Sequence, residues 1–550
     1  MERILFVVPP YVSYENYVNP LPSERIVSKK SGDYGSVVTD MPIGLLSLSA
    51  YLKKHSSVEV KLLDFNVILN KTDNFIYKSF SEMFLEVLSG KEWLDFDPTI
   101  IGISTLFTPA YHNMVAISEV ARRAFPDAMM IAGGGVPTIM HREIFAVTSC
   151  FDALCYGEGE RPLLGLVNAV DKRGFLNSHP SWITRGKSEA GFQFQYDFIS
   201  DLDEIPFYDY KLLRVEDYGL SPTVNAYSSF DPDKKRIFHV ATSRGCPHLC
   251  CFCASHKVHG RKMRYHTVDR VKEDITRLQK EYGAKTIGFQ DDSFMINRKR
   301  ALQIIQIARE LKIKIFFNSG LALYALDQEM LEAIKSAGLD ELVLAMESGS
   351  DRVLKEVMHK PINTAMIKRV IEDCRKLGIN TDANILIGLP GETKQDIEDT
   401  RSFLRSIDVS WFCIYTAAPL VGSEMYDICV DKNYLKGSHI GSDFKRAVIE
   451  TDEFTPEWIQ EKVYLLNLEL NFVENNDLRL GNYATALKGF ENTIRVRADH
   501  ALAYYYASKC YGKLGDVERA SRYMGIAKQI VQRDHSWQRY ASTFGIYELI

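Results

Sequence analysis

Short apolar runs alternate with amphipathic stretches over residues 1 to about 180. The apolar runs predict buried parallel strands; they are RILFVV (3–8), VEVKLLDF (58–65), TIIGIST (99–105), AMMIAGGG (128–135) and DALCYG (152–157). Amphipathic stretches at 42–55, 111–125 and 159–173 predict the helices between these strands. This βαβ rhythm predicts an α/β domain, residues 1–180, with a doubly wound, Rossmann-like sheet.

Doubly wound sheets bind their ligands outside the carboxyl ends of the strands. The segments expected there are PPYVSYENY (9–17), STLFTPAYH (104–112), GGGVPT (133–138) and YGEGE (156–160). We therefore expect a ligand of the first domain to contact these four loops.

The rhythm breaks over residues 181–235, which are irregular and rich in aromatic side chains. We interpret this segment as a linker that packs between two domains. The βα rhythm resumes over residues 236–445, with strands expected at 237–242, 286–292, 313–319, 342–348, 381–388 and 411–417. Six successive units predict a partial (β/α)6 barrel, whose active site should lie at the carboxyl ends of its strands.

Residues 446–550 have a helical pattern. Thr455 is the expected N-cap of a helix with Pro456 at its first position. Further on, LGNYATALKGFENTI is echoed by LGDVERASRYMGIAK, with Gly481 and Gly515 34 residues apart. This period resembles a tetratricopeptide repeat. Two interpretations stay open: a helical cap on the barrel, or a surface for a protein or peptide partner.

Composition narrows the class of protein. The chain has 550 residues and a net charge of −5, so we expect several domains and no basic field for nucleic acid. MERILFVVPPY lacks the basic start and cleavage site of a signal peptide, and no apolar run approaches the roughly 18–20 residues of a membrane span. We expect a cytoplasmic protein, in which clustered cysteines indicate metal binding or catalysis.

Such a cluster follows the first predicted strand of the barrel. Cys246, Cys250 and Cys253 form C-x3-C-x2-C within TSRGCPHLCCFC. Three thiolates on one tight loop can bind three irons of a four-iron cluster, which leaves the fourth iron open to another ligand. Gly245 and Pro247 fit a constrained turn.

A structural zinc site is the alternative, and it would need four protein ligands. His256 or Cys251 could be the fourth, but no second C-x-x-C pair is present. Cys251 otherwise stands outside the pattern, and we expect it to point away from the cluster.

TSRGCPHLCCFC resembles the signature of the radical S-adenosylmethionine (SAM) superfamily, including the aromatic Phe252 before the last cysteine. The resemblance implies a [4Fe–4S] cluster on the three cysteines, SAM on its open iron, and a 5′-deoxyadenosyl radical. FQDDSF (289–294), AMESGS (345–350) and ILIGLPGET (385–393) resemble the SAM-binding strand ends of that family. The implied SAM contacts are Phe252, Gln290, Asp291, Asp292, Ser319, Glu347, Ser348 and Gly388. Taken alone, these polar residues could be a solvated loop or a buried salt-bridge partner.

The first domain carries a second resemblance. IIGISTLFTPAYHNM (100–114) is similar to the strand and loop that hold the nucleotide tail of cobalamin in methionine-synthase-type domains, and IAGGGVPT and YGEGE match further loops of cobalamin-binding domains. The implied cobalamin contacts are Ser104, Leu106, Thr108, Gly133, Gly134, Gly135, Tyr156, Gly157 and Glu158. The three glycines would let the backbone approach a large planar ligand.

One departure concerns the cobalt. The D-x-H-x-x-G loop that ligates cobalt should follow the first strand, but PPYVSYENYVN has no histidine and His112 follows the third strand. We expect no imidazole ligand to cobalt, as in radical SAM relatives with this domain. A domain that kept the fold and lost the cofactor is the alternative. A dinucleotide is disfavoured, because GGGVPT follows a late strand.

The two resemblances together imply a cobalamin-dependent radical SAM enzyme, most often a C-methyltransferase that uses methylcobalamin and the deoxyadenosyl radical on an unactivated carbon. A reductant such as flavodoxin or ferredoxin is implied as well. The alternatives are a radical cyclase or rearrangement enzyme without net methylation, a cobalamin-free radical SAM enzyme, and a tetratricopeptide-type scaffold with an inactive barrel. No residue identifies the substrate, which could be a small molecule, a peptide or a protein.

Overall fold

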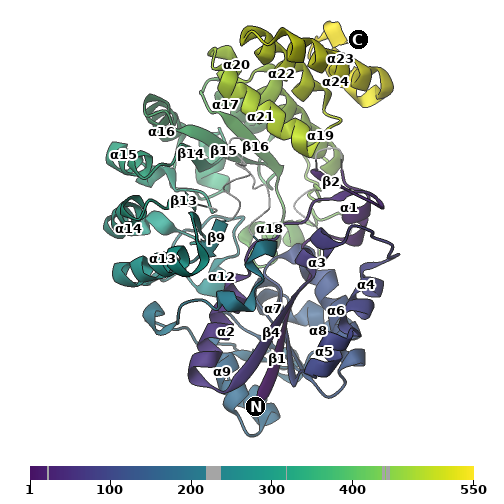
Figure 1. Ribbon diagram of the computed structural model, residues 1–550, viewed down its shortest axis with the longest axis vertical. Helices are drawn as coiled ribbons and strands as arrows, with labels where there is room; N and C mark the ends of the chain where they lie inside the picture. The colour runs from purple at the N-terminus through teal and green to yellow at the C-terminus, as the bar shows by residue number, and fades with distance from the viewer. Residues whose placement is uncertain (22–23, 219–236, 318, 437–439, 441–445, 550) are drawn as a thin grey trace.

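A computed structural model describes residues 1–21, 24–218, 237–317, 319–436, 440 and 446–549. Figure 1 shows three parts: an N-terminal α/β domain in purple and blue, a barrel in teal and green, and C-terminal helices in yellow-green. The two α/β parts meet through the carboxyl-end loops of the first domain, and α12 (His256–His259) of the barrel contacts α7 (Gly135–Ile139) there.

The N-terminal sheet has the order β4-β1-β5-β6-β7-β8. Its strands are β1 (Glu2–Val8), β4 (Val58–Asp64), β5 (Ile100–Ser104), β6 (Met129–Gly133), β7 (Ala153–Cys155) and β8 (Trp182–Ile183); all neighbours are parallel except β7 and β8. The runs are apolar throughout because helices cover both faces of the sheet. The doubly wound prediction is confirmed.

The helices of this domain lie between the strands. They are α1 (Tyr14–Val18), α2 (Ile43–His55), α3 (Phe65–Lys71), α4 (Phe80–Leu88), α5 (Lys91–Phe96), α6 (Tyr111–Ala124), α7, α8 (His141–Val147), α9 (Glu160–Asn168) and α10 (Lys172–Ser178). An antiparallel hairpin of β2 (Ile26–Lys29) and β3 (Gly32–Gly35) leaves the sheet and approaches the C-terminal helices, where the Arg497 guanidinium donates to the carbonyls of Leu21 and Glu24.

The predicted linker begins too early. Trp182 and Ile183 form β8, which pairs with β7, and α11 (Arg185–Glu189) follows in the same domain. The next described residues form only the short turns η2 (Leu202–Glu204), η3 (Tyr210–Leu212) and η4 (Val215–Asp217). Buried Leu202, Ile205 and Tyr210 pack into the barrel core. Residues 219–235 of the predicted linker lie outside the described residues.

The barrel strands form two hydrogen-bonded groups, β13-β12-β9 and β14-β15-β16. They are β9 (Ile237–Val240), β12 (Thr286–Phe289), β13 (Lys314–Phe317), β14 (Glu341–Glu347), β15 (Asn380–Ile387) and β16 (Trp411–Thr416). A parallel bridge between Leu321 and Leu344 joins the groups. The result is a partial barrel of six parallel strands in sequence order, as predicted.

Helices cover the outside of this barrel (Figure 1). They are α13 (Val268–Tyr282), α14 (Arg298–Glu310), α15 (Gln328–Ser336), α16 (Thr364–Lys376) and α17 (Lys394–Arg405), with a π-helical turn, η7 (Val353–Val357), after β14. The helix α18 (Glu424–Asp431) lies instead between the barrel and the first domain. The helices begin where the sequence supplies caps: the Thr267 side chain caps α13, and Thr393 with Asp396 forms a capping box on α17.

The C-terminal helices are α19 (Pro456–Leu468), α20 (Asn476–Arg479), α21 (Tyr483–Val496), α22 (Ala501–Lys513), α23 (Val517–Arg533) and α24 (His535–Thr543). Thr455 caps α19 as predicted. Asn467 and Asn471 exchange hydrogen bonds with the backbone of Ile414 and Phe412, so this region satisfies the outer edge of β16. The tetratricopeptide assignment stays a prediction. Within the described residues, no helix is long and apolar enough to cross a membrane.

Candidate active site at the domain interface

The three cysteines lie on the loop between β10 (Ser243–Arg244) and β11 (Arg264–Tyr265), an antiparallel pair that follows β9. Gly245 has φ +96°, and a Cβ there would lie 2.5 Å from the carbonyl oxygen of Lys262. The Cys246 N–H donates to the Gly260 carbonyl at 3.3 Å. Glycine is therefore required at position 245 for the loop to close against its own return segment.

Cys251 points away from the three cysteines, as predicted. Its side chain is buried in the barrel core, and burial raises the pKa of its thiol to about 12. Its N–H donates to the carbonyl of Met358 and its carbonyl accepts from the N–H of Met425. Cys251 thus anchors the cluster loop on the segment after η7 and on α18.

The electrostatics of Cys246 and Cys250 fit a cationic cluster. Burial raises the pKa values of Cys246 and Cys250, that of Cys250 to about 11, and the negative charge of a neighbouring cysteine thiolate raises each of them further. An iron–sulfur cluster would supply the positive charge that makes three adjacent thiolates favourable. In the described parts of the chain, no three His, Cys, Asp or Glu side chains converge on a single metal ion, whereas cluster ligands bind three different irons and stand further apart.

Gln290, Asp291 and Asp292 follow β12 at the same edge. The structure gives Asp291 a role other than the predicted SAM contact: its buried carboxylate accepts from the N–H and hydroxyl of Thr242 and from the hydroxyl of Ser243. Asp291 therefore fixes the chain that enters the cluster loop. Gln290 and Asp292 remain partly exposed, and they stay candidate SAM contacts.

Glu347 ends β14 in a strained conformation. Its φ is +68°, and the register with β15 shifts between Ala345 and Glu347. The Lys360 ammonium donates to the Glu347 carboxylate at 3.1 Å and to the Ala345 carbonyl at 2.7 Å. The positive charge of Lys360 also lowers the pKa of Cys250, against the effect of burial. Glu347 and Lys360 are thus close to the cluster loop.

The remaining predicted SAM residues differ in access. Ser319 is exposed and Phe252 is half-buried against the barrel core. Ser348 is buried, with its hydroxyl bonded to Thr400 and to the N–H of Ser350, so it shapes the turn and does not face a ligand.

Gly388 has φ +93°, and a Cβ there would lie 3.0 Å from Ile459 of α19. The buried Glu392 carboxylate accepts from the N–H groups of Gly388 and Leu389, and burial raises its pKa to about 8. Glu392 therefore holds the strand end whose sequence resembles an adenine contact.

Cobalamin would lie at the carboxyl ends of β5, β6 and β7. Ser104 ends β5, and Leu106 and Phe107 after it are 46% and 47% exposed. Thr108 begins a 3-10 turn. The buried Thr105 hydroxyl has no hydrogen-bond partner among the described residues. Exposed apolar side chains beside an unsatisfied buried hydroxyl are what a large ligand with apolar and polar parts would cover, so these residues fit cobalamin.

Two of the glycines have a packing role inside the domain. Cβ atoms at Gly134 and Gly135 would lie 2.6 Å from the Thr105 carbonyl oxygen and 2.5 Å from that of Leu106. These glycines let the β6 loop pack against the β5 loop. At Gly133 a Cβ would meet only Cys155, at an ordinary 3.6 Å, so Gly133 remains available to a ligand.

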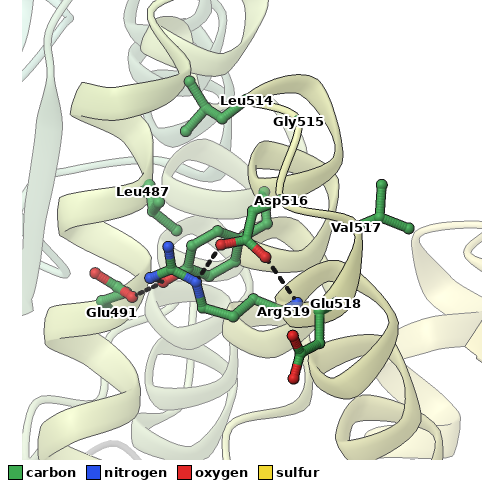
Figure 2. A pocket seen from close by; sticks show the side chains of 9 residues that line it. Leu487, Glu491, Leu514, Gly515, Asp516, Val517, Glu518 and Arg519 are labelled. Carbon is green, nitrogen blue, oxygen red and sulfur yellow. Dashed lines mark hydrogen bonds and ion pairs between the residues drawn. The ribbon is translucent and has the colours of Figure 1, made fainter.

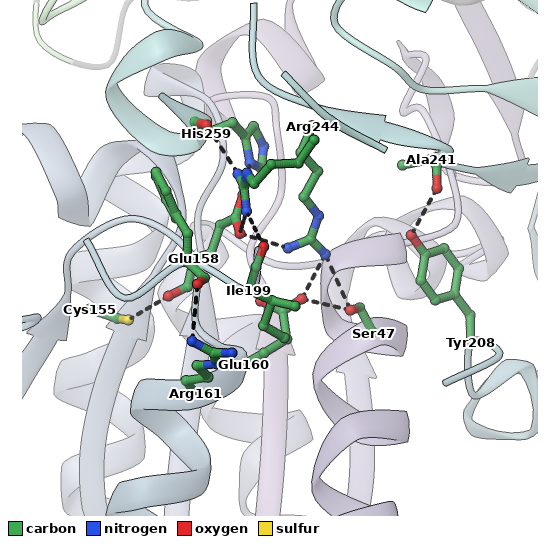
Figure 3. A network of polar contacts seen from close by, with 12 residues as sticks. Ser47, Cys155, Glu158, Glu160, Arg161, Ile199, Tyr208, Ala241, Arg244 and His259 are labelled. Atoms are coloured by element: carbon green, nitrogen blue, oxygen red, sulfur yellow. Dashed lines mark hydrogen bonds and ion pairs between the residues drawn. The ribbon is translucent and has the colours of Figure 1, made fainter. Parts of the chain in front are cut away.

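Glu158 of YGEGE is not free to contact cobalamin. Its side chain is 3% exposed and forms a bidentate pair with Arg264, at 2.6 and 2.8 Å, within a larger network (Figure 3). Arg244 pairs with Glu158 at 3.0 Å and with Glu160 at 2.7 Å. The carboxylates belong to the first domain and the arginines flank the cluster loop, so YGEGE joins the two cofactor-binding regions.

The other residues of this motif also serve the interface. Tyr156 stacks on Tyr196, which stacks on Phe198, and the Arg264 guanidinium lies 4.2 Å from the centre of the Phe198 ring. A Cβ at Gly157, where φ is +80°, would lie 2.6 Å from the ring of Tyr196. The aromatic residues of the predicted linker thus close over YGEGE.

Two further histidines lie on the STLFTPAYH loop and on the cluster loop. His112 lies at the start of α6 and contacts the Ile440 carbonyl at 2.9 Å. His248 of the cluster loop contacts the hydroxyl of Tyr324 at 2.8 Å, so Tyr324 reaches the cluster loop.

Sequence reasoning missed Arg244, Arg264, His259, Lys360 and Glu392. Arg244 and Arg264 stand two residues before Cys246 and eleven after Cys253, and that proximity was the one available signal. Lys360 and Glu392 carry no signal in a single sequence, because each acts on a residue brought close by the fold.

Comparison with known proteins assigns both domains. Residues 240–404 match the family model of the radical SAM superfamily, and residues 36–167 match that of the B12 binding domain. An uncharacterized methyltransferase of Pyrococcus horikoshii is 26% identical over 75% of this chain and 83% of its own. A cytidylyl-2-hydroxyethylphosphonate methyltransferase of Streptomyces wedmorensis is 26% identical over 72% of this chain and 78% of its own.

Solved structures share the whole architecture. OxsB, a cobalamin-dependent SAM radical enzyme solved with aqua-cobalamin and SAM, superposes with a TM-score of 0.60 at 14% identity, covering 100% of this chain and 81% of OxsB. TsrM of Kitasatospora setae, a radical SAM methyltransferase solved with cobalamin and a [4Fe–4S] cluster, gives a TM-score of 0.58 at 15% identity, covering 97% of this chain and 100% of TsrM. The two domains imply a [4Fe–4S] cluster, SAM and cobalamin as cofactors. This chain is a radical SAM enzyme with a cobalamin-binding domain.

Proposed function

We propose that this enzyme is a cobalamin-dependent radical SAM C-methyltransferase that acts on an unactivated carbon. The observation that carries the proposal is the contact between α7, which follows the glycine loop of the first domain, and α12, which follows Cys253. Val258 of α12 would lie 3.8 Å from a Cβ at Gly135. The loops expected to hold cobalamin and the cluster therefore adjoin one another.

The bound groups supply methyl transfer and hydrogen-atom abstraction, and the chain supplies their alignment. Cys246, Cys250 and Cys253 would hold the cluster. Gln290, Asp292 and Glu347 would bind the polar groups of SAM, with Lys360 fixing Glu347. Leu106 and Phe107 would cover the corrin and exclude water.

A cyclase is the second candidate. An anaerobic magnesium-protoporphyrin IX monomethyl ester cyclase of Rubrivivax gelatinosus is 28% identical over 61% of this chain and 59% of its own. Product mass separates the two candidates, because methylation adds one CH₂ to the substrate and cyclisation does not.

The relatives bear on the class of substrate. The relatives favour a small molecule, and a peptide or protein stays an alternative. A small acidic electron carrier such as flavodoxin or ferredoxin is the reductant we propose, and the cytoplasm is the compartment, since the cluster thiols must stay reduced.

A protein partner could dock on the C-terminal helices. A hollow of about 600 Å³ lies between α21, α22 and α23. Figure 2 shows the side chains that line it. Its lining combines apolar side chains with the Asp516–Arg519 pair; the residues are Leu487, Glu491, Tyr511, Leu514, Gly515, Asp516, Val517, Glu518 and Arg519. It lies apart from the cofactor loops, so we assign it no part in the chemistry.

The test is cofactor content followed by product mass. Protein purified without oxygen and given hydroxocobalamin should bind a [4Fe–4S] cluster and one cobalt per chain. Incubation with SAM that carries a deuterated methyl group should then give a product heavier by that group. Iron without cobalt would reject the methyltransferase.

A further inference from the structure

The polar network in Figure 3 joins the first domain to the barrel through ion pairs of Arg244 with Glu158 and Glu160. Glu158 and Glu160 come from the loop between β7 and α9, and Arg244 and Arg264 come from the two strands that flank the cysteines. Arg244 and Arg264 are direct partners in the β10–β11 pair. Any shift of the carboxylates is therefore passed to both ends of the cluster loop.

Both carboxylate oxygens of Glu158 contact basic side chains. The Oε1 atom of Glu158 lies 2.6 Å from Nη2 of Arg264 and 2.8 Å from Nδ1 of His259, and its Oε2 atom lies 2.8 Å from Nη1 of Arg264 and 3.0 Å from Nη1 of Arg244. Ion pairs buried in this way hold their geometry tightly, because no water competes for the donors.

The network reaches the SAM side of the cluster as well. Burial raises the pKa of Asp292, the candidate SAM contact after β12; His259 at the end of α12 opposes this shift and Glu158 adds to it. On the other side, Glu158 is two residues from Tyr156, and Glu160 accepts from the hydroxyl of Ser47 in α2 at 2.7 Å. One carboxylate thus lies between the loops assigned to the two cofactors.

We propose that Glu158, through its ion pairs with Arg244 and Arg264, is a positioning residue that sets the distance between the cobalamin-binding loops and the cluster loop. Removing these ion pairs should slow methyl transfer from SAM to cobalamin and leave reductive cleavage of SAM intact. The inference rests on the proposed function. A displacement of about 1 Å can cost on the order of 100-fold in rate, so we expect a loss of about 10- to 100-fold.

Two products of SAM report the two events without a substrate. In methyl transfer, SAM loses its methyl group as a cation equivalent and leaves as S-adenosylhomocysteine, while the electron pair of the new bond comes from cobalamin reduced by titanium citrate. In reductive cleavage, one electron from the same reductant passes through the cluster and breaks the 5′ carbon–sulfur bond. Methionine and 5′-deoxyadenosine result, after the radical takes a hydrogen atom from buffer or protein.

The experiment compares Glu158→Gln with Glu204→Gln in protein loaded with cluster and hydroxocobalamin. Glu204 pairs with Arg161 in the same region, but this pair is well exposed, so its loss should change neither product. For Glu158→Gln we expect iron, cobalt and 5′-deoxyadenosine as in the wild type, with S-adenosylhomocysteine per bound cobalt reduced 10-fold or more. If Glu158→Gln formed both products at wild-type levels, the proposal would be overturned.

The remaining outcomes are also decisive. If Glu158→Gln fails to fold or to bind iron, Arg264→Lys decides, because it keeps the positive charge and removes the bidentate pair with Glu158. A reduced proportion of S-adenosylhomocysteine in that variant supports the proposal, and an unchanged proportion rejects it. If the loaded wild type forms 5′-deoxyadenosine but no S-adenosylhomocysteine, the proposed function fails.

Discussion

The conformation of the cluster loop depends on Gly245. The variant Gly245→Ala should therefore bind little iron. Position 245 has φ +96°, and an alanine Cβ would lie 2.5 Å from the Lys262 carbonyl oxygen and 3.1 Å from its carbon. The backbone conformation alone costs about 1–3 kcal/mol for a residue with a side chain. The 260–262 segment must also move away, which removes the bond from Cys246 to Gly260, worth about 1 kcal/mol.

The two costs, about 2–4 kcal/mol together, fall on the loop that presents the thiols. Gly338→Ala is the matched control: φ there is +83°, but nothing lies within 4 Å of the added Cβ. We expect Gly338→Ala to lower stability and keep full iron, and Gly245→Ala to lose most iron and sulfide after anaerobic reconstitution. If Gly245→Ala bound a full cluster, the contact with Lys262 would not control the loop.

Three further predictions concern residues around the cluster and SAM. Cys253→Ala should abolish 5′-deoxyadenosine formation, measured by chromatography. Cys251→Ala, which removes a thiol of the core, should retain this activity. Equal loss in both variants would show that the cluster ligands were assigned wrongly. Lys360→Met should shift the cluster's reduction potential downward, by about 59 mV if the equilibrium changes tenfold, because a positive charge beside Cys250 favours the reduced cluster; Lys360→Arg should not, and an unchanged potential in a spectroscopic titration would reject the role. Burial raises the pKa of Glu392 from 4.5 to about 8, so the folded state holds its proton and loses stability as pH rises through that range. Glu392→Gln should flatten this dependence in thermal melts and keep SAM affinity, whereas Glu392→Ala should weaken SAM binding by about 1–3 kcal/mol; a pH profile that survives in the glutamine variant would exclude Glu392 as its source.

The fold could be predicted because its signals are local. Strands buried on both faces have continuous apolar sequences such as RILFVV. The three thiols of the cluster loop lie within eight residues of one another. The place of the site followed from topology, since parallel strands bring their carboxyl ends to one edge. β8 was missed because two residues carry too little pattern to distinguish a strand from a linker.

The roles of single polar residues could not be predicted in the same way. Glu158 meets Arg264 across 106 positions of sequence, and no local pattern states which carboxylate finds a partner. Asp291 and Ser348 were assigned to SAM by their place in motifs, but their hydrogen bonds go to Thr242 and Thr400. Gly134 and Gly135 likewise serve the packing of two loops. A motif shows where a site lies, and burial decides which of its side chains face the ligand.

The most direct test of the account is whether SAM loses its methyl group in a cobalamin-dependent way. Protein with a full cluster is incubated with SAM and titanium citrate, with and without bound cobalamin, and S-adenosylhomocysteine and 5′-deoxyadenosine are both measured. The account predicts 5′-deoxyadenosine in both samples and S-adenosylhomocysteine only with cobalamin. Protein that carries both cofactors and forms 5′-deoxyadenosine but no S-adenosylhomocysteine would contradict it.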